Sequence, residues 1–202
     1  MSEVKYSKEN LYSENVHIYS ESSPNPNSMK FVVNFILIQE GDSFDFPTLE
    51  SAKSSPLATE LFGFKYVTRV FFMNNFITVT KDDAIGWEEA NPEIRAFIKN
   101  FFLAKKPLFD ETQPEQEVVL NNDSEAVKKI KGVLDEYIRP AVEMDGGAIQ
   151  FHSFDAQEGT LKVLLQGSCS GCPSSMITLK AGIQNLMQRM VPQVKEVIAE
   201  GI

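Results

Sequence analysis

The sequence contains few of the residues that metal sites and nucleic-acid surfaces require. Among 202 residues there are 2 cysteines and 2 histidines, and 19 basic side chains stand against 28 acidic ones. The resulting net charge of −9 excludes the broad basic surface that neutralises phosphates. We therefore expect no binding of nucleic acid.

Long apolar runs and an export signal are also missing. No run approaches the roughly 20 apolar residues that a membrane-spanning helix needs, so we expect no membrane association. The first residues, MSEVKYSKENLYSENVHIY, contain no long apolar run and no small-residue cleavage site, and their three Glu make a poor transit peptide. These features predict a reducing compartment, where a structural disulfide is disfavoured.

Phenylalanine and charge both divide the chain in two. Of 15 Phe, 13 lie before residue 111 and only Phe151 and Phe154 follow. Between the two parts, residues 110–121 (DETQPEQEVVLN) carry 4 acidic and no basic side chains, which is typical of a solvated linker. We predict two small domains, 13–109 and 122–202, joined by the acidic linker 110–121.

The first domain has the pattern of mixed strands and helices. A turn of Pro and Asn residues at 23–28 separates its first two strands, and Asn74-Asn75 is typical of a hairpin turn. Ser55-Pro56 begins one helix, which ends at Gly63. Strands are predicted over 16–22, 30–38, 67–73 and 76–81, and a longer helix over 87–104.

The second domain has the predicted order helix, strand, strand, loop, helix, strand. Asn122 followed by Glu125 is a capping-box pattern for its first helix. Strands are expected over 148–155, 160–166 and 194–199, and the second helix begins near Pro173 and ends at Pro192. The fold class is therefore α+β in both domains.

Both cysteines lie in the segment GSCSGCPSS, residues 167–175. A C-x-x-C spacing lets two sulfurs bind one centre, and the small Ser170 and Gly171 allow a tight loop. The following helix directs unpaired N–H groups and partial positive charge at the loop, which predicts a lowered cysteine pKa.

Three functions are compatible with the pair Cys169 and Cys172. A thioredoxin-like dithiol fits the position before a helix, but the preceding strand belongs to a hairpin and no Trp or Tyr lies near. A zinc site needs more ligands than one pair, and His17 and His152 are poor candidates because one lies in the other domain and one faces away from the core. An iron–sulfur cluster takes four thiolates, which suggests a symmetric dimer with one pair from each copy.

The match to a known family is longer than the cysteine pair. The second domain resembles the NifU-like C-terminal domain, and the first resembles the N-terminal domain of the Nfu family of iron–sulfur scaffold and carrier proteins. The resemblance of the second domain rests on DGG (145–147), LLQG (164–167), SCSGCPSS (168–175) and TLK (178–180). The resemblance of the first domain rests on PNPNSMKF (24–31), SPLA (55–58), LF (61–62), VFF (70–72) and FITVTK (76–81).

The resemblance implies a carrier that is not an enzyme. It implies that Cys169 and Cys172 hold a labile cluster, [4Fe–4S] in preference to [2Fe–2S], shared between the two subunits of a homodimer when loaded. The cluster would come from an upstream assembly scaffold or cysteine desulfurase system and pass to apo iron–sulfur proteins. Eukaryotic members add a presequence, so its absence predicts a bacterial-type cytoplasmic protein or a mature chain, and we expect the cytoplasmic form.

Overall fold

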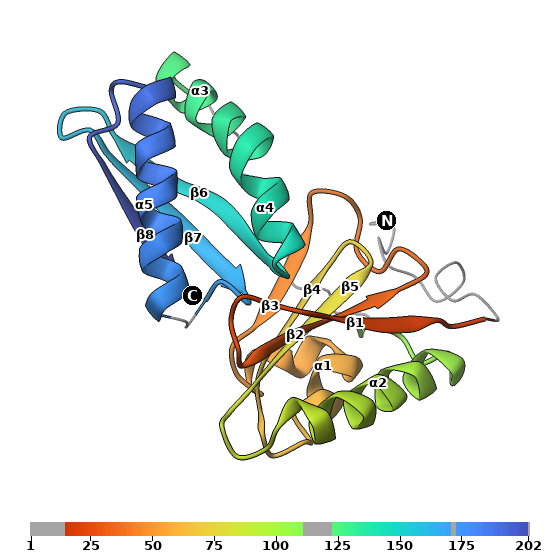
Figure 1. Ribbon diagram of the computed structural model, residues 1–202. Helices are drawn as coiled ribbons and strands as arrows, with labels where there is room; N and C mark the ends of the chain where they lie inside the picture. The colour runs from red at the N-terminus through yellow and green to blue at the C-terminus, as the bar shows by residue number, and fades with distance from the viewer. Residues whose placement is uncertain (1–14, 111–122, 171–172, 202) are drawn as a thin grey trace, which may run out of the picture. The chain divides into compact units, whose positions relative to one another are not determined.

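The computed structural model describes residues 15–110, 123–170 and 173–201. The chain divides into two compact units, Met1–Gln116 and Glu117–Ile202, each with its own sheet and helices, as the α+β prediction requires (Figure 1). The division falls inside the predicted linker 110–121. Because residues 111–122 lie outside the described part, the linker boundaries remain a prediction.

The first unit is a five-stranded antiparallel sheet in the order β1-β2-β5-β4-β3. Two α-helices lie on the same face of this sheet (Figure 1) and enclose an aromatic-rich core. The elements are β1 (Ile18–Ser22), β2 (Ser28–Val33), β3 (Ser43–Phe46), η1 (Ser51–Ser54), α1 (Pro56–Leu61), β4 (Val67–Met73), β5 (Phe76–Lys81) and α2 (Trp87–Leu103).

The hairpin of β4 and β5 has the predicted bounds. Asn74 has φ of 46°, a left-handed conformation that asparagine tolerates, and so it closes the turn. Its carbonyl accepts hydrogen bonds from the N–H groups of Leu37 and Ile38, at 2.7 and 2.9 Å. The α1 prediction is also confirmed: the hydroxyl of Ser55 caps the helix by accepting from the N–H of Ala58.

Two features of the first unit differ from the predictions. Strand β2 ends at Val33 rather than Ile38, because the backbone of Leu37 and Ile38 bonds to the Asn74 turn instead of a neighbouring strand. Both side chains are fully buried, so a buried loop produced the same apolar pattern as a strand. Strand β3 and the 3₁₀ turn η1 were not predicted, because four-residue elements are too short to show a period.

The second unit is a three-stranded sheet in the order β6-β7-β8. Strands β6 and β7 form an antiparallel hairpin, whereas β7 and β8 are parallel and are connected through α5. Figure 1 shows α5 beside the helical run that begins this unit. The elements are α3 (Glu125–Val133), η2 (Leu134–Ile138), α4 (Arg139–Met144), β6 (Gly147–Asp155), β7 (Thr160–Gly167), α5 (Pro173–Met190) and β8 (Glu196–Gly201).

The first helix of this unit differs from the prediction at both ends. Its N-cap is Ser124, whose hydroxyl accepts from the N–H of Val127, rather than Asn122, which lies outside the described residues. The run widens into a π-helical turn over η2, where the N–H of Arg139 bonds to the carbonyl of Leu134. Pro140 follows directly and explains the turn, because proline cannot donate to the preceding turn and its ring crowds that turn's carbonyl.

The end of the chain follows the prediction closely. Helix α5 ends at Met190, before Pro192, and β8 begins at Glu196, two residues later than expected. The delay arises because the N–H of Val194 bonds to Val191 in a turn and that of Lys195 bonds to Gly159. Among the described helices, none has the length and apolar character that crossing a membrane requires.

Candidate metal centre

Cys169 lies in the loop that connects β7 to α5, in the second unit. Its side chain is 8% exposed and packs with the aliphatic core of that unit. Cys172, the other predicted ligand, lies outside the described residues. The structure therefore places one of the two predicted cluster ligands, at the end of a strand and before a helix, as expected.

Hydrogen bonds from Ser168 fix the loop to the turn that precedes β6. Its N–H donates to the carbonyl of Gly146 at 3.3 Å, and its hydroxyl donates to the carbonyl of Asp145 at 2.6 Å. On the other side of the cysteine, the N–H of Ser170 donates to the carbonyl of Gly167 at 3.1 Å. Ser168 thus ties the loop to the turn before β6, and Ser170 ties it to the last residue of β7.

Glycine allows the close approach of this loop to the sheet. A Cβ at Gly147 would lie 2.9 Å from Sγ of Cys169 and 2.6 Å from the carbonyl oxygen of Gln166, both shorter than real contacts. A Cβ at Gly201, at the end of β8, would lie 2.7 Å from Oγ of Ser170. Both strands that flank the loop thus carry a glycine where the cysteine segment passes.

Sequence reasoning did not assign a role to Ser168, Gly147 or Gly201. The strand was predicted to begin at residue 148, although Gly147 is the first residue of β6 and pairs with Gly167. The signal that could have identified it was the second glycine of Asp145-Gly146-Gly147. Gly146, with φ of 85°, already satisfies the turn, so a further glycine indicates close packing.

The environment of Cys169 raises the pKa of its thiol. Burial is the main cause, because desolvation disfavours the thiolate, and the charge of Asp145 adds to it. The hydroxyl of Ser168, 3.8 Å from Sγ, acts in the opposite direction. The prediction of a lowered pKa is therefore wrong for this cysteine, because desolvation by burial is the largest influence on its thiol.

Further metal ligands are not gathered around Cys169 in the described part of the chain, where no three His, Cys, Asp or Glu side chains come together. His152 is exposed at a bulge of β6, with Nδ1 3.2 Å from the hydroxyl of Ser153. The expectation that it faces away from the core is therefore confirmed. Any centre that includes Cys169 needs ligands beyond this described set.

One sequence argument against a dithiol function is weakened by the topology. Strand β7 belongs to a hairpin, as predicted, but it also pairs in parallel with β8 through α5. Cys169 therefore lies in a strand–helix–strand crossover, the setting in which C-x-x-C redox motifs are found.

Comparison with known proteins matches both units to described domains. Residues 18–105 match the domain described as scaffold protein Nfu/NifU N terminal, and residues 130–198 match the NifU-like domain. The chain belongs to the Nfu/NifU family. The resemblance inferred from the cysteine loop and the first domain is thus confirmed.

Curated members of the family align with most of this chain. NifU-like proteins 4 and 5, mitochondrial, of Arabidopsis thaliana are each 42% identical over 186 residues, which is 91% of this chain and 65% and 67% of theirs. The NFU1 iron-sulfur cluster scaffold homolog, mitochondrial, of Drosophila persimilis is 41% identical over 89% of this chain and 64% of its own. The chain thus spans about two thirds of the length of these relatives.

The names of these relatives correct one prediction. All three are called mitochondrial, which contradicts the expectation of a bacterial-type cytoplasmic protein. That expectation relied on the absence of a targeting segment from the first residues. Because the relatives are longer than this chain, its first residues do not identify the compartment.

Proposed function

We propose that this chain is an iron–sulfur cluster scaffold and carrier that holds its cluster with Cys169 and Cys172. The observation that carries the proposal is the position of Cys169 in a member of the Nfu/NifU family. The cysteine occupies a loop that is bonded to the Asp145–Gly146 turn and packed against Gly147. This is a preformed position for one ligand of a cargo cluster.

The cluster would be shared by two copies of the chain. Clusters of the [2Fe–2S] and [4Fe–4S] types are commonly held by four thiolates, and this chain has two cysteines. Two copies related by a two-fold axis would supply the four thiolates. Within each chain, Met144 (73% exposed) precedes the turn that anchors the loop, and Ile177 (72% exposed) lies near the start of α5. These apolar side chains suit a surface that becomes covered when two copies meet.

Transfer would proceed by ligand exchange and would need no catalytic group. A thiolate of the apo-protein forms a bond to an iron, the bond between that iron and Cys169 or Cys172 breaks, and the departing thiolate takes up a proton. No oxidation state changes in this step, and repetition moves the whole cluster. Because two thiolates per chain hold it, the cluster would pass readily to a target that offers more ligands.

The suppliers and recipients follow from this role. A cysteine desulfurase system or an upstream assembly scaffold would supply sulfide or a preformed cluster. Apo iron–sulfur proteins would receive it. We favour [4Fe–4S] over [2Fe–2S] as the cargo.

Anaerobic reconstitution with iron and sulfide tests the proposal. About two irons and two sulfides per chain are expected for a [4Fe–4S] cluster shared by two copies, and about one of each for a shared [2Fe–2S] cluster. Cys169→Ala should abolish loading, whereas the matched control His152→Ala, at an exposed potential ligand of the same unit, should load as wild type. Equal loading of both variants would contradict the proposal.

A dithiol redox protein is the second candidate, favoured by the strand–helix–strand setting of Cys169. It predicts a reversible disulfide between Cys169 and Cys172 in a colourless protein that needs no iron. A zinc-bridged dimer would also be colourless but would contain about one zinc for every two chains, with four thiolate ligands. Metal analysis of the reconstituted protein, with thiol titration, separates both from the cluster carrier.

A further inference from the structure

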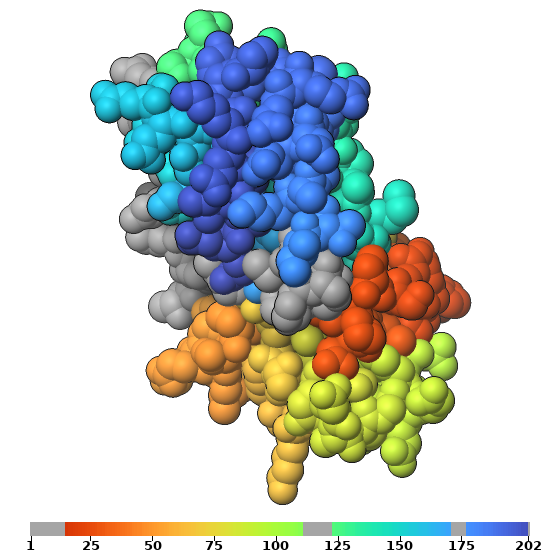
Figure 2. All heavy atoms as spheres, turned by 60° about the vertical axis from the view of Figure 1, so that its left-hand side comes forward, coloured from red at the N-terminus to blue at the C-terminus, as the bar shows by residue number. Residues whose placement is uncertain are grey.

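A groove runs between β1 and α2 in the first unit, far in the sequence from the cysteine loop. Strand β1 is the outermost strand of its sheet, and α2 lies beside it on the surface (Figure 2). The cavity between them has a volume of about 540 Å³. Its lining includes His17, Ile18 and Tyr19 on β1 and its N-terminal flank, and Arg95, Ala96 and Lys99 on α2.

The helical wall of the groove carries positive charge. Arg95 and Lys99 lie one turn apart on α2 and are both exposed, and neither forms an ion pair with another described residue. Several other cations of this unit do form ion pairs: Lys30 pairs with Glu21, Arg69 with Asp45 and Lys106 with Glu60. In a chain of net charge −9, an uncompensated pair of cations in a groove favours an acidic ligand.

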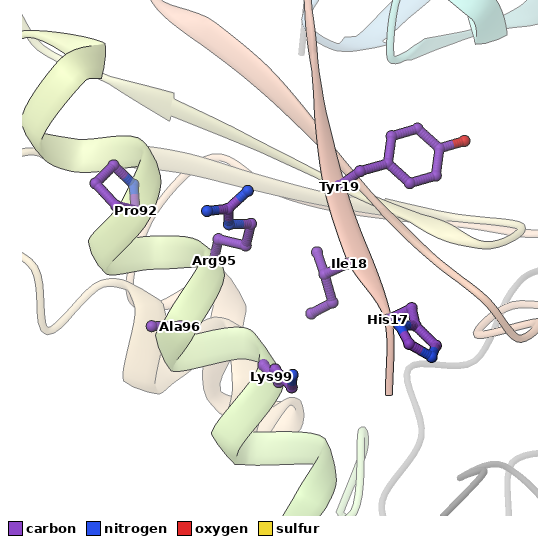
Figure 3. Close-up of a pocket in the computed structure, with 7 residues that line it drawn as sticks. All are labelled: His17, Ile18, Tyr19, Pro92, Arg95, Ala96 and Lys99. Carbon is purple, nitrogen blue, oxygen red and sulfur yellow. The ribbon is translucent and has the colours of Figure 1, made fainter. Parts of the chain in front are cut away.

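The strand wall offers backbone and alternating side chains. As an edge strand among the described ones, β1 presents backbone groups that a further strand could pair with. Figure 3 shows Ile18 directed toward α2 and Tyr19 directed away from it. Tyr19 is 55% exposed. A segment added to β1 would therefore place every second side chain toward α2 and the others toward Tyr19.

The spacing of the charges matches an extended peptide. Side chains two residues apart on a strand are separated by roughly 7 Å, and neighbours one turn apart on a helix by about 5–6 Å at Cβ. Two carboxylates at positions i and i+2 of an added strand could thus each meet one of Arg95 and Lys99. The groove is open and its cations are exposed, which suits a peptide better than a small anion, for which a buried cradle is needed.

We propose that the groove between β1 and α2 binds an extended acidic segment of a partner protein, which adds to the free edge of β1 and places carboxylates against Arg95 and Lys99. Recognition of this kind draws affinity from main-chain hydrogen bonds and specificity from alternate side chains. It assigns partner recognition to the first unit and does not depend on the chemistry of the cysteine loop.

Fluorescence anisotropy with labelled peptides tests this proposal on the full chain. The probe alternates Glu and Val over eight residues, and a second peptide of the same composition has its four Glu and four Val in separate blocks. We expect the alternating peptide to bind more tightly, and inorganic phosphate at equal charge not to displace it. Equal affinity for both peptides, or displacement by phosphate, would overturn strand addition in favour of a general anion surface.

Charge reversal locates the site. R95E combined with K99E should weaken binding by about tenfold or more, because two attractions become repulsions. Lys65→Glu, an exposed cation of the same unit outside the groove, is the matched control and should leave affinity near wild type. Hydrogen exchange should show protection of β1 amides in the presence of the alternating peptide. Unchanged exchange, or equal weakening by the control, would contradict the proposal.

Discussion

The two units share the α+β class but are built from different residues. The first covers one face of a five-stranded antiparallel sheet with α1 and α2 and fills the space with aromatic rings, such as Phe46 against Phe72 and Phe35 against Phe102. The second has three strands and an aliphatic core that includes Cys169. The smaller core holds the only described cysteine, so the chemistry that we propose lies in the second unit.

Close packing around Cys169 is a second difference between the two units. In the first unit the tight turns depend on residues such as Asn74, whose conformation closes a hairpin. In the second, Gly147 and Gly201 are needed because the Cys169 segment passes within contact distance of two strands. The difference suggests that substitutions in the first unit change folding, whereas those near the loop change cluster loading.

The largest expected effect comes from the aromatic core of the first unit. Phe72→Ala should lower the free energy of unfolding of that unit by about 3–5 kcal/mol, because a fully buried ring in contact with Phe46 is removed. Iron loading per folded chain should stay at the wild-type value, since the cysteines lie in the other unit. Chemical denaturation followed by iron analysis measures both quantities. If fully folded Phe72→Ala protein took up less iron than wild type, the assignment of cluster binding to the second unit alone would be contradicted.

Gly147→Ala should have the opposite pattern to Phe72→Ala, with a larger effect on cluster loading than on folding. The added methyl group would lie 2.9 Å from Sγ of Cys169 and against the backbone of Gln166, so the loop must move, at a cost of about 1–3 kcal/mol. We expect cluster loading to fall by more than the loss of folded protein. The matched control is Gly132→Ala, where nothing lies within 4 Å of the new Cβ and helix stability should rise by about 0.5–1 kcal/mol.

Ser168→Ala removes the hydrogen bond to the carbonyl of Asp145. The cost should be about 1 kcal/mol of stability, with faster hydrogen exchange in the loop and faster loss of the cluster to a chelator. Ser153→Ala removes a half-buried hydroxyl of β6 that lies 3.2 Å from Nδ1 of the exposed His152, and it should change neither the exchange of the loop nor the rate of cluster loss. Identical chelation rates for the two variants would show that the anchor does not hold the loop.

The last prediction concerns an effect that is confined to the start of the second unit. Ser124→Ala should destabilise α3 by about 1 kcal/mol, because the hydroxyl that accepts from Val127 is lost. Asn122→Ala should have little effect if Ser124 is the cap. Thermal unfolding of both variants decides between the observed cap and the one predicted from the sequence. A larger loss for Asn122→Ala would favour the capping box.

Elements with a strong local signal were predicted correctly. The β4–β5 hairpin, α1 after Ser55, α2, and the order of the second unit all follow from period, turn chemistry and proline position. The predictions failed where tertiary contacts decide: Ile38 bonds to a turn rather than a strand, and Pro140 is accommodated by a π-helical turn. The parallel pairing of β7 with β8 is a long-range contact that no local pattern reveals.

The candidate site was predicted in part. The cysteine loop was identified from one short segment, but the family was identified from several segments in both domains, because a lone C-x-x-C pair is compatible with several functions. The environment of Cys169 was not, because the raised pKa results from burial by residues distant in the sequence. The contacts of Ser168 and Gly147 likewise depend on strand pairing, which places residues 145–147 next to the loop.

Native mass spectrometry of the anaerobically reconstituted protein tests the central claim most directly. The account predicts a dimer that carries one cluster, with four irons per two chains if the cargo is [4Fe–4S], and its dissociation into cluster-free monomers when a chelator removes the iron. Cys169→Ala should give no loaded dimer. A monomer that carries an intact cluster, or a metal-free monomer with a reversible disulfide, would contradict a cluster shared between two copies.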